Sequence, residues 1–426
     1  MNIQLSEHFT YKKLLRFILP SIIMMVFTSI YSVVDGIFVS NFVGKSAFAS
    51  VNLIMPYLMG ISALGFMIGT GGSAFVSKTL GEGKKKLANQ YFSMLVTIAA
   101  IGGFVLSVLS FIFMRRIVMA FGAAGDLIDY CTLYGRISCI SLTAFMLQNV
   151  FQSFFVAAGK PQLGLKVIVA AGCTNIVLDA LFIGVLHFGI AGAAFATMTS
   201  EFTGGLLPVV YFFRKNDSLL HFVKPVFDRR VFLKTCTNGS SELMTNLSMS
   251  LVNALYNLQL MKIAGENGVA AYGAVMYVNF IFVATFLGYA IGCAPVISYH
   301  YGAGNHAELK NLYKKSMSII LVWGVILFGA AQLLAPVLSK IFVGYNTGLY
   351  AMTLHGFRVY AIAFLIIGIN IFGSSFFTAL NNGLISAVIS FLRTLMFQVI
   401  MVLTLPLWFG INGIWSAISV AEALTL

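Results

Sequence analysis

The sequence predicts an all-α membrane protein with twelve transmembrane helices, and three observations support this fold class. Of the 426 residues, 59% are hydrophobic and only 9% are charged, whereas soluble domains carry roughly 25% charged residues. The chain holds about a dozen apolar stretches that approach or exceed the roughly 20 residues needed to cross a bilayer. These stretches leave no room for a sizeable soluble domain. The composition therefore excludes a soluble globular enzyme, and it is too apolar for a disordered chain.

The twelve apolar runs follow one another with short polar connections. They cover residues 14–39, 50–76, 90–113, 133–157, 166–186, 190–212, 236–261, 272–299, 315–338, 357–380, 386–407 and 411 to the end. The first run is preceded by a polar segment without signal-peptide features, so we expect a retained helix. The last run holds 16 residues up to Leu426, too few to cross about 30 Å at about 1.5 Å per residue. We therefore expect the last helix to be truncated.

The formal net charge is +13, from 26 Lys and Arg against 13 Asp and Glu. In a soluble protein this excess would suggest nucleic-acid binding, but here it fits the positive-inside bias of membrane proteins, so no nucleic-acid partner is expected. With the N-terminus in the cytoplasm, 19 basic residues fall on the inner side. The outer side carries the other seven: Lys45, Arg115, Arg116, Arg136, Lys262, Lys340 and Arg358. The asymmetry predicts a multi-pass protein of the bacterial inner (plasma) membrane with both termini in the cytoplasm.

An internal repeat divides the chain into two halves. At a shift of 221 residues the matches include Gly81 with Gly302, Gly83 with Gly304, and Phe188-Gly189-Ile190 with Phe409-Gly410-Ile411. Six spans per half give both halves the same orientation, which predicts two six-helix lobes related by a pseudo-twofold axis normal to the membrane. The predicted organisation is an N-lobe over 1–213, a cytoplasmic linker over 214–234 and a C-lobe over 235–426. Such a pair favours a rocking transporter with its substrate cavity between the lobes; the alternative is a duplicated structural bundle.

Acidic residues inside apolar runs are candidates for function, because a charge in hydrocarbon is costly. Asp35 and Asp179 lie at similar depth in the first and fifth runs, and Asn175 shares a helix face with Asp179. Two neighbouring carboxylates in a low dielectric need a shared proton or a bound cation such as Na⁺. The alternative is that each accepts an interhelical hydrogen bond.

Two further acids, Glu201 and Glu242, are possible secondary members of the cation-coupling site. Glu201 and Glu422 are repeat partners, which suggests a shared structural role at the seam between the lobes. Glu242 is expected in the first turn of the seventh helix, where it could be functional or could cap the helix. Pro20 lies inside the first helix, where it invites a kink.

Several segments carry a resemblance to a known family. They are Pro20 with Val-Val-Asp-Gly-Ile-Phe-Val around Asp35, Leu80-Gly81-Glu82-Gly83, Ala157-Ala158-Gly159-Lys160-Pro161, Asn175-Ile-Val-Leu-Asp179, Gly189-Ile190-Ala191-Gly192-Ala193-Ala194 and Tyr301-Gly302-Ala303-Gly304-Asn305. By the order and spacing of these segments, the chain resembles the multidrug and toxic compound extrusion (MATE) transporters of the multidrug/oligosaccharidyl-lipid/polysaccharide flippase superfamily.

The resemblance implies two six-helix lobes in a V shape and export of bulky, amphipathic, often cationic compounds in exchange for H⁺ or Na⁺. It also implies an N-lobe cation site at the positions of Asp35, Asn175, Asp179 and Thr197. In another branch of the family an acid on helix 7 joins one on helix 10. Here Glu242 is the acid on helix 7, but helix 10 carries no acid and offers only Asn370. We therefore do not expect a complete C-lobe site.

Other features refine the functional expectation. Polar residues inside apolar runs could line the substrate cavity or bond neighbouring helices, namely Asn149, Gln152, Asn253, Asn257 and Gln259. Enzyme and nucleotide-binding motifs are absent, so we expect secondary transport by a monomer in contact with lipid, without a cofactor other than the coupling ion. A lipid-linked sugar flippase is the alternative. Basic residues are scarce in mid-membrane, with Arg393 placed near an inner end, and this favours the exporter.

Overall fold

The computed structural model describes residues 3–43, 45–125, 127–344 and 346–426, and this part of the chain is almost entirely helical. The first half contains α1 (Tyr11–Phe38), α2 (Lys45–Gly81), α3 (Lys85–Ala120), α4 (Leu127–Ala157), α5 (Pro161–Asp179) and α6 (Gly189–Phe213). Short π-helical segments over Val39–Val43 and Ala180–Val185 extend α1 and α5. The second half contains α7 (Arg229–Gly302), α8 (His306–Val343), α9 (Thr347–Tyr360), α10 (Phe364–Ala379), α11 (Gly383–Phe391), α12 (Phe397–Phe409) and α13 (Ile411–Thr425).

Nine helical segments of the described chain are long and apolar enough to cross a membrane. The long α7 contains two spans, because Gly265 interrupts it with φ 63° and ψ −153°, a conformation that favours glycine. Short 3₁₀ and π-helical segments join α9 to α10 and α11 to α12 into single spans. With α6 and the short α13, the arrangement has twelve spans, and the predicted fold class is confirmed.

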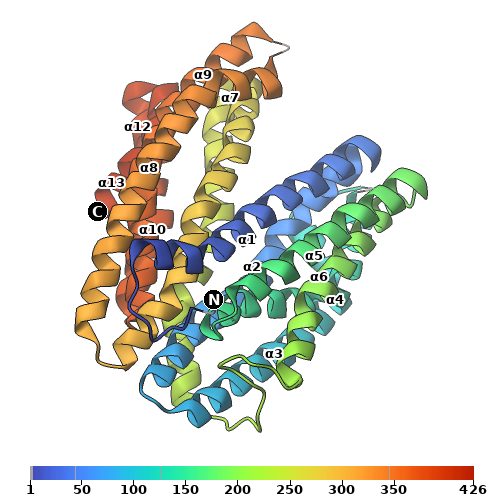
Figure 1. Cartoon of the computed structure of the whole chain (residues 1–426). Helices are drawn as coiled ribbons and strands as arrows, with labels where there is room; N and C mark the ends of the chain where they lie inside the picture. Colours follow the sequence, from blue (N-terminus) through green and yellow to red (C-terminus); the bar gives the residue numbers. More distant parts are fainter. Residues whose placement is uncertain (1–2, 44, 126, 345) are drawn as a thin grey trace.

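The helices form two bundles, α1–α6 and α7–α13, which converge at one end and separate toward the other (Figure 1). The α2–α3 and α7–α8 connections lie at the converging end, and the α8–α9 connection lies at the separated end. Irregular chain over residues 214–228 links α6 to α7 and is held to the N-lobe, where the His221 N–H donates to Asn89 Oδ1 at 2.8 Å.

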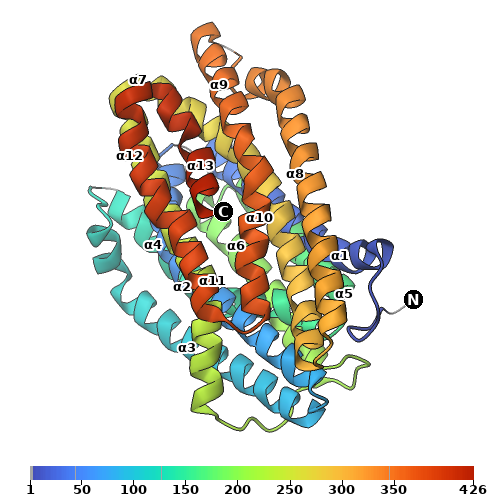
Figure 2. The ribbon, with the colours of Figure 1, turned by 90° about the vertical axis from the view of Figure 1, so that its left-hand side faces the viewer.

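The segment before α1 belongs spatially to the second bundle. Phe9 is fully buried, its N–H donates to Glu308 Oε1 at 2.9 Å, and its carbonyl accepts from Lys315 Nζ at 2.6 Å. Figure 2 shows this segment and the start of α1 beside α8. The N-terminus therefore ties the first helix of one lobe to the other lobe.

The hydrophobic core differs between the lobes. The C-lobe has one continuous cluster of buried apolar side chains. The N-lobe has two clusters, one that includes Phe92 and Phe212 and one that includes Tyr134 and Ile190.

The lobes meet through backbone contacts at the converging end. A Cβ added at Gly81 would meet the carbonyl oxygen of Tyr299, and one added at Gly302 would meet that of Lys78. Lys78 and Tyr299 are themselves 221 residues apart, so these are the same contact made twice with the halves exchanged. Such an exchange is expected of a twofold relation. Gly239 of α7 similarly faces the backbone of Met67 on α2.

Replacing Gly239 by alanine is expected to separate the lobes at this end. The new methyl group would overlap the Met67 backbone, and overpacking typically costs about 1–3 kcal/mol unless the helices move apart. Nitroxide labels at Lys85→Cys and His306→Cys, in a background without other cysteines, should report a longer distance in this variant. Gly273→Ala is the matched control in α7, because a Cβ there meets open space. An unchanged distance distribution in Gly239→Ala would contradict the tight crossing.

Candidate cation and substrate sites

Two carboxyl groups face each other inside the N-lobe, one partly buried and one fully buried. Asp35 on α1 and Asp179 at the end of α5 lie close enough for their carboxyl groups to interact directly, and Asn175 lies beside Asp35. Asp179 is fully buried, and neither of its carboxylate oxygens has a hydrogen-bond donor within the described chain. The geometry therefore requires that a proton or a cation separate the two carboxylates.

The residues around this pair supply further oxygen ligands. Asp35 Oδ1, Asn175 Oδ1 and Thr197 Oγ1 are also buried and lack partners among the described residues. Asp35, Asn175 and Thr197 line a cavity of about 110 Å³. The structure thus brings the four predicted cation-site residues together from α1, α5 and α6. Carboxylate, amide and hydroxyl oxygens are the donor set that hard cations prefer.

The same cavity contains a third acid. Glu201 on α6 lines it beside Asp35 and accepts a hydrogen bond from Ser141 Oγ at 2.5 Å. The expectation of a structural role at the lobe seam was wrong for Glu201, because this side chain lies inside the N-lobe. Tyr31 and Tyr134, which the sequence does not single out, also line the cavity. Among 17 tyrosines, no local pattern distinguishes these two.

The repeat partner of Glu201 has a different environment. Glu422 on α13 is buried within the C-lobe, where it accepts from Asn370 Nδ2 at 2.8 Å and lies 3.5 Å from Arg393 Nε. The seam expectation was therefore wrong for Glu422 as well. The Arg393 side chain is 11% exposed and lines a C-lobe cavity of about 80 Å³.

The two lobes therefore neutralise their buried acids differently. The repeat partner of Arg393 is Gly172, where an added Cβ would meet the rings of Phe27 and Tyr31, so no long cation fits there. The C-lobe carries a covalently attached cation beside its acid. The N-lobe acids Asp35 and Asp179 have no such cationic partner among the described residues.

Glu242 does not lie in the first turn of the seventh helix, where the sequence led us to expect it. The α7 helix begins at Arg229, and Asp228 caps it by accepting hydrogen bonds from the N–H groups of Arg230 and Val231. The capping interpretation of Glu242 was therefore wrong. Glu242 instead lines a cavity of about 110 Å³ whose walls come from both lobes. The walls are Met25, Phe66, Thr70, Ser73, Ser153, Thr245, Asn246, Met249, Leu287, Ala290, Ile291, Ala294, Ser375 and Thr378.

The polar residues expected at a substrate cavity fall into different environments. Asn149 is buried and donates to the Ser62 carbonyl at 3.2 Å, an interhelical bond between α4 and α2. Gln152, three residues later in α4, is also buried. Neither Asn149 nor Gln152 lines the cavities described above. Asn253 lines the C-lobe cavity, where it accepts from the Tyr272 hydroxyl at 2.9 Å. Asn257 is exposed. Asn149 therefore bonds neighbouring helices, and Asn253 lines a cavity inside the C-lobe and not the one between the lobes; contact of these residues with a substrate stays a prediction.

The chain resembles known proteins over nearly its full length. It is 24% identical over 425 residues to the multidrug export protein MepA of Staphylococcus haemolyticus strain JCSC1435, covering 98% of this chain and 92% of that protein. A crystal structure of MATE in complex with MaL6 has a TM-score of 0.93 at 24% identity, covering 98% of this chain and 94% of that one. An outward-facing multidrug resistance MATE transporter has a TM-score of 0.92 at 24% identity and the same coverage.

A family model described as MatE matches the chain twice, at residues 20–181 and 243–404. The two matches fall in the two lobes and mirror the internal repeat. Because together they cover more than half of the sequence, the chain belongs to the MatE family, the MATE transporters.

Proposed function

We propose that this chain exports bulky, amphipathic, often cationic compounds in exchange for H⁺ or Na⁺. The observation that carries the proposal is the facing pair Asp35 and Asp179, whose buried oxygens lack donors in the described chain. An exchangeable proton or sodium ion satisfies this pair, with Asn175 and Thr197 as further oxygen ligands for Na⁺. The name of the MepA relative supports a multidrug cargo.

The coupling follows from the charge of the pair. When the ion leaves, two carboxylates face each other in a medium of low dielectric, and repulsion favours a different shape of α1 or α5. Pro20 lowers the cost of bending α1, because it removes one backbone hydrogen bond. The ion can shift this equilibrium only by its differential affinity for the two shapes, and a tenfold difference corresponds to about 1.4 kcal/mol.

The cavity around Glu242 is the proposed contact site for the cationic cargo. It is walled by both lobes, so rocking of the lobes would change its access from one side to the other. A buried carboxylate attracts an organic cation, while Met and Phe side chains such as Met25 and Phe66 adapt to flat apolar rings.

The proposed orientation places the converging end, and with it the N-terminal segment before α1, in the cytoplasm of a bacterial cell. The segments 82–86, 214–234 and 310–315 supply many of the basic residues and lie at that end, as the positive-inside bias requires. The lobes would then be separated on the outer side. A monomer suffices for this mechanism, because one chain supplies both lobes.

A flippase for lipid-linked sugars is less well supported. Anionic diphosphate cargo would call for cations in the central cavity, yet none of its lining residues is Lys or Arg. Arg393 does not line this cavity; it lies inside the C-lobe, 3.5 Å from Glu422, and its charge also acts on Glu242.

The direct test is ethidium transport in vesicles that contain the purified protein. An imposed pH gradient and an imposed Na⁺ gradient are applied one at a time, and we expect ethidium movement with at least one of them. Protein-free vesicles give the leak. Transport with neither gradient would contradict the proposal.

The ion and the drug are expected to weaken each other's binding by the same factor, because linkage is reciprocal. Calorimetry of ethidium binding at low and high pH, with and without Na⁺, measures this factor. This factor should be about tenfold if the ion binds one shape of the lobe about tenfold more tightly than the other. In an Asp35→Asn protein the dependence should disappear. An affinity that is the same in all conditions for the unaltered protein would remove the N-lobe acids as the coupling device.

A further inference from the structure

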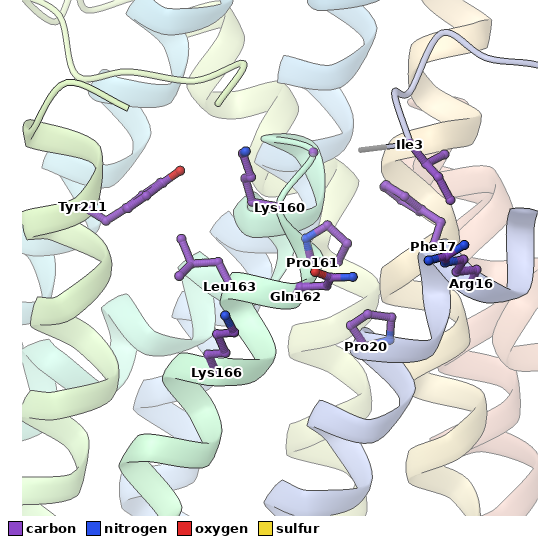
Figure 3. Close-up of a pocket in the computed structure, with 11 residues that line it drawn as sticks. Ile3, Arg16, Phe17, Pro20, Lys160, Pro161, Gln162, Leu163, Lys166 and Tyr211 are labelled. Carbon is purple, nitrogen blue, oxygen red and sulfur yellow. The ribbon is translucent and has the colours of Figure 1, made fainter. Parts of the chain in front are cut away.

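A pocket lined by three basic side chains lies outside both transport cavities, at the converging end of the N-lobe. It has a volume of about 260 Å³ and is formed between the start of α1, the first turns of α5 and the end of α6. Figure 3 shows Arg16, Phe17 and Pro20 of α1 facing the α5 segment that carries Pro161 and Lys166. Ile3, from the N-terminal segment that packs on the other lobe, also contributes to the wall.

The charged residues of this pocket are all basic. Arg16, Lys160 and Lys166 line it, and its walls contain no Asp or Glu. Lys160 donates to Asp217 Oδ2 at 2.7 Å, and this hydrogen bond lowers the pKa of Asp217. Arg16 and Lys166 are exposed and form no ion pair within the described chain. Two basic side chains without an ion-pair partner in the described chain therefore line the same pocket.

The remaining walls are mostly apolar. Ile3, Phe17, Pro20 and Leu163 supply hydrocarbon, and Tyr211 adds an aromatic ring with a polar tip, as residues at a membrane interface often do. A soluble anion would gain little from such walls, whereas a molecule with an anionic head and hydrocarbon chains would use both surfaces. In addition, α5 begins at Pro161, so its N-terminal dipole favours a phosphate near Lys160.

We propose that this pocket binds the headgroup of an anionic phospholipid, with Arg16 and Lys166 on either side of the headgroup and the acyl chains along Ile3 and Leu163. Basic pockets between transmembrane helices are a recurrent way to hold anionic headgroups. The site is independent of the transport proposal, because it shares no residue with the N-lobe acid site or with the cavity around Glu242. Its ligand would contact α1 at Pro20, on the helix that also carries Asp35.

The test compares two fluorescent lipids with the same acyl chains on the purified full chain in neutral detergent. Phosphatidylglycerol should bind more tightly than phosphatidylcholine. The double variant Arg16→Gln with Lys166→Gln should weaken phosphatidylglycerol binding by about tenfold or more, because each of the two cations adds to the attraction for the anionic headgroup. Lys12→Gln with Lys86→Gln is the matched control, because these two exposed lysines lie outside the pocket and carry the same charge. Lys166→Gln alone, at an exposed position, should show part of the loss and replaces the double variant if that protein does not fold.

Three results would overturn the proposal. An equal loss in the control variant would mean diffuse attraction to the basic surface. Equal binding of phosphatidylcholine would mean an apolar groove without headgroup recognition. Displacement of the lipid by soluble glycerol phosphate at comparable concentration would mean a site for free phosphate compounds.

Discussion

An Asp35→Asn protein is expected to lose gradient-driven ethidium transport while it folds normally. Asparagine keeps the shape of the side chain but cannot exchange a proton, and it removes one of the two charges that hold Na⁺ against Asp179. We expect transport in vesicles to fall to the leak of protein-free vesicles, with a thermal midpoint in detergent close to that of the unaltered protein. Removing one of two facing carboxylates relieves repulsion, so the midpoint should be maintained or raised.

Asp129→Asn is the matched control for this experiment. Asp129 is an exposed acid at the start of α4 whose only described ion pair is with Arg115 at 3.7 Å. The same chemical change there should leave transport intact. Normal transport by Asp35→Asn would show that Asp35 only bonds neighbouring helices.

Breaking the Arg393–Glu422 pair is expected to destabilise the C-lobe strongly. Arg393→Met leaves the carboxylate of Glu422 buried without its cation, and breaking a buried pair in this way typically costs about 3–5 kcal/mol. The free energy of unfolding in mixed micelles and the thermal midpoint should both fall. The double variant Arg393→Met with Glu422→Gln should recover most of the loss, because no charge remains and the substituted amide oxygen can still accept from Asn370.

The exposed pair between Arg115 and Asp129 provides the comparison. Its side chains are 63% and 79% exposed, and exposed pairs contribute about 0–1 kcal/mol. Arg115→Met should therefore leave the free energy of unfolding nearly unchanged. A double variant at Arg393 and Glu422 as unstable as Arg393→Met alone would mean that packing of the arginine, and not charge compensation, is what the C-lobe needs.

The sequence by itself determined the membrane fold, the twelve spans and the duplication. These properties are local or periodic: a span is an apolar run of sufficient length, because lipid forces each segment to satisfy its own backbone hydrogen bonds. It also pointed to Asp35, Asn175 and Asp179 as neighbours, whereas Thr197 was added only by the resemblance to the family. Helix direction sets the depth of each acid, and the spacing of four residues puts Asn175 and Asp179 on one face.

The tertiary structure alone decided which distant side chains meet. Glu201 joins the Asp35 cavity, Glu242 lines the space between the lobes, and Arg393 reaches Glu422 across the C-lobe. Hydropathy gives the depth of a residue but not the direction in which its side chain points around the helix axis. That rotation is set by close contacts between helices, such as those of Gly239 with Met67 and of Gly81 with Tyr299. Such contacts depend on both partners at once, so neither segment encodes them alone.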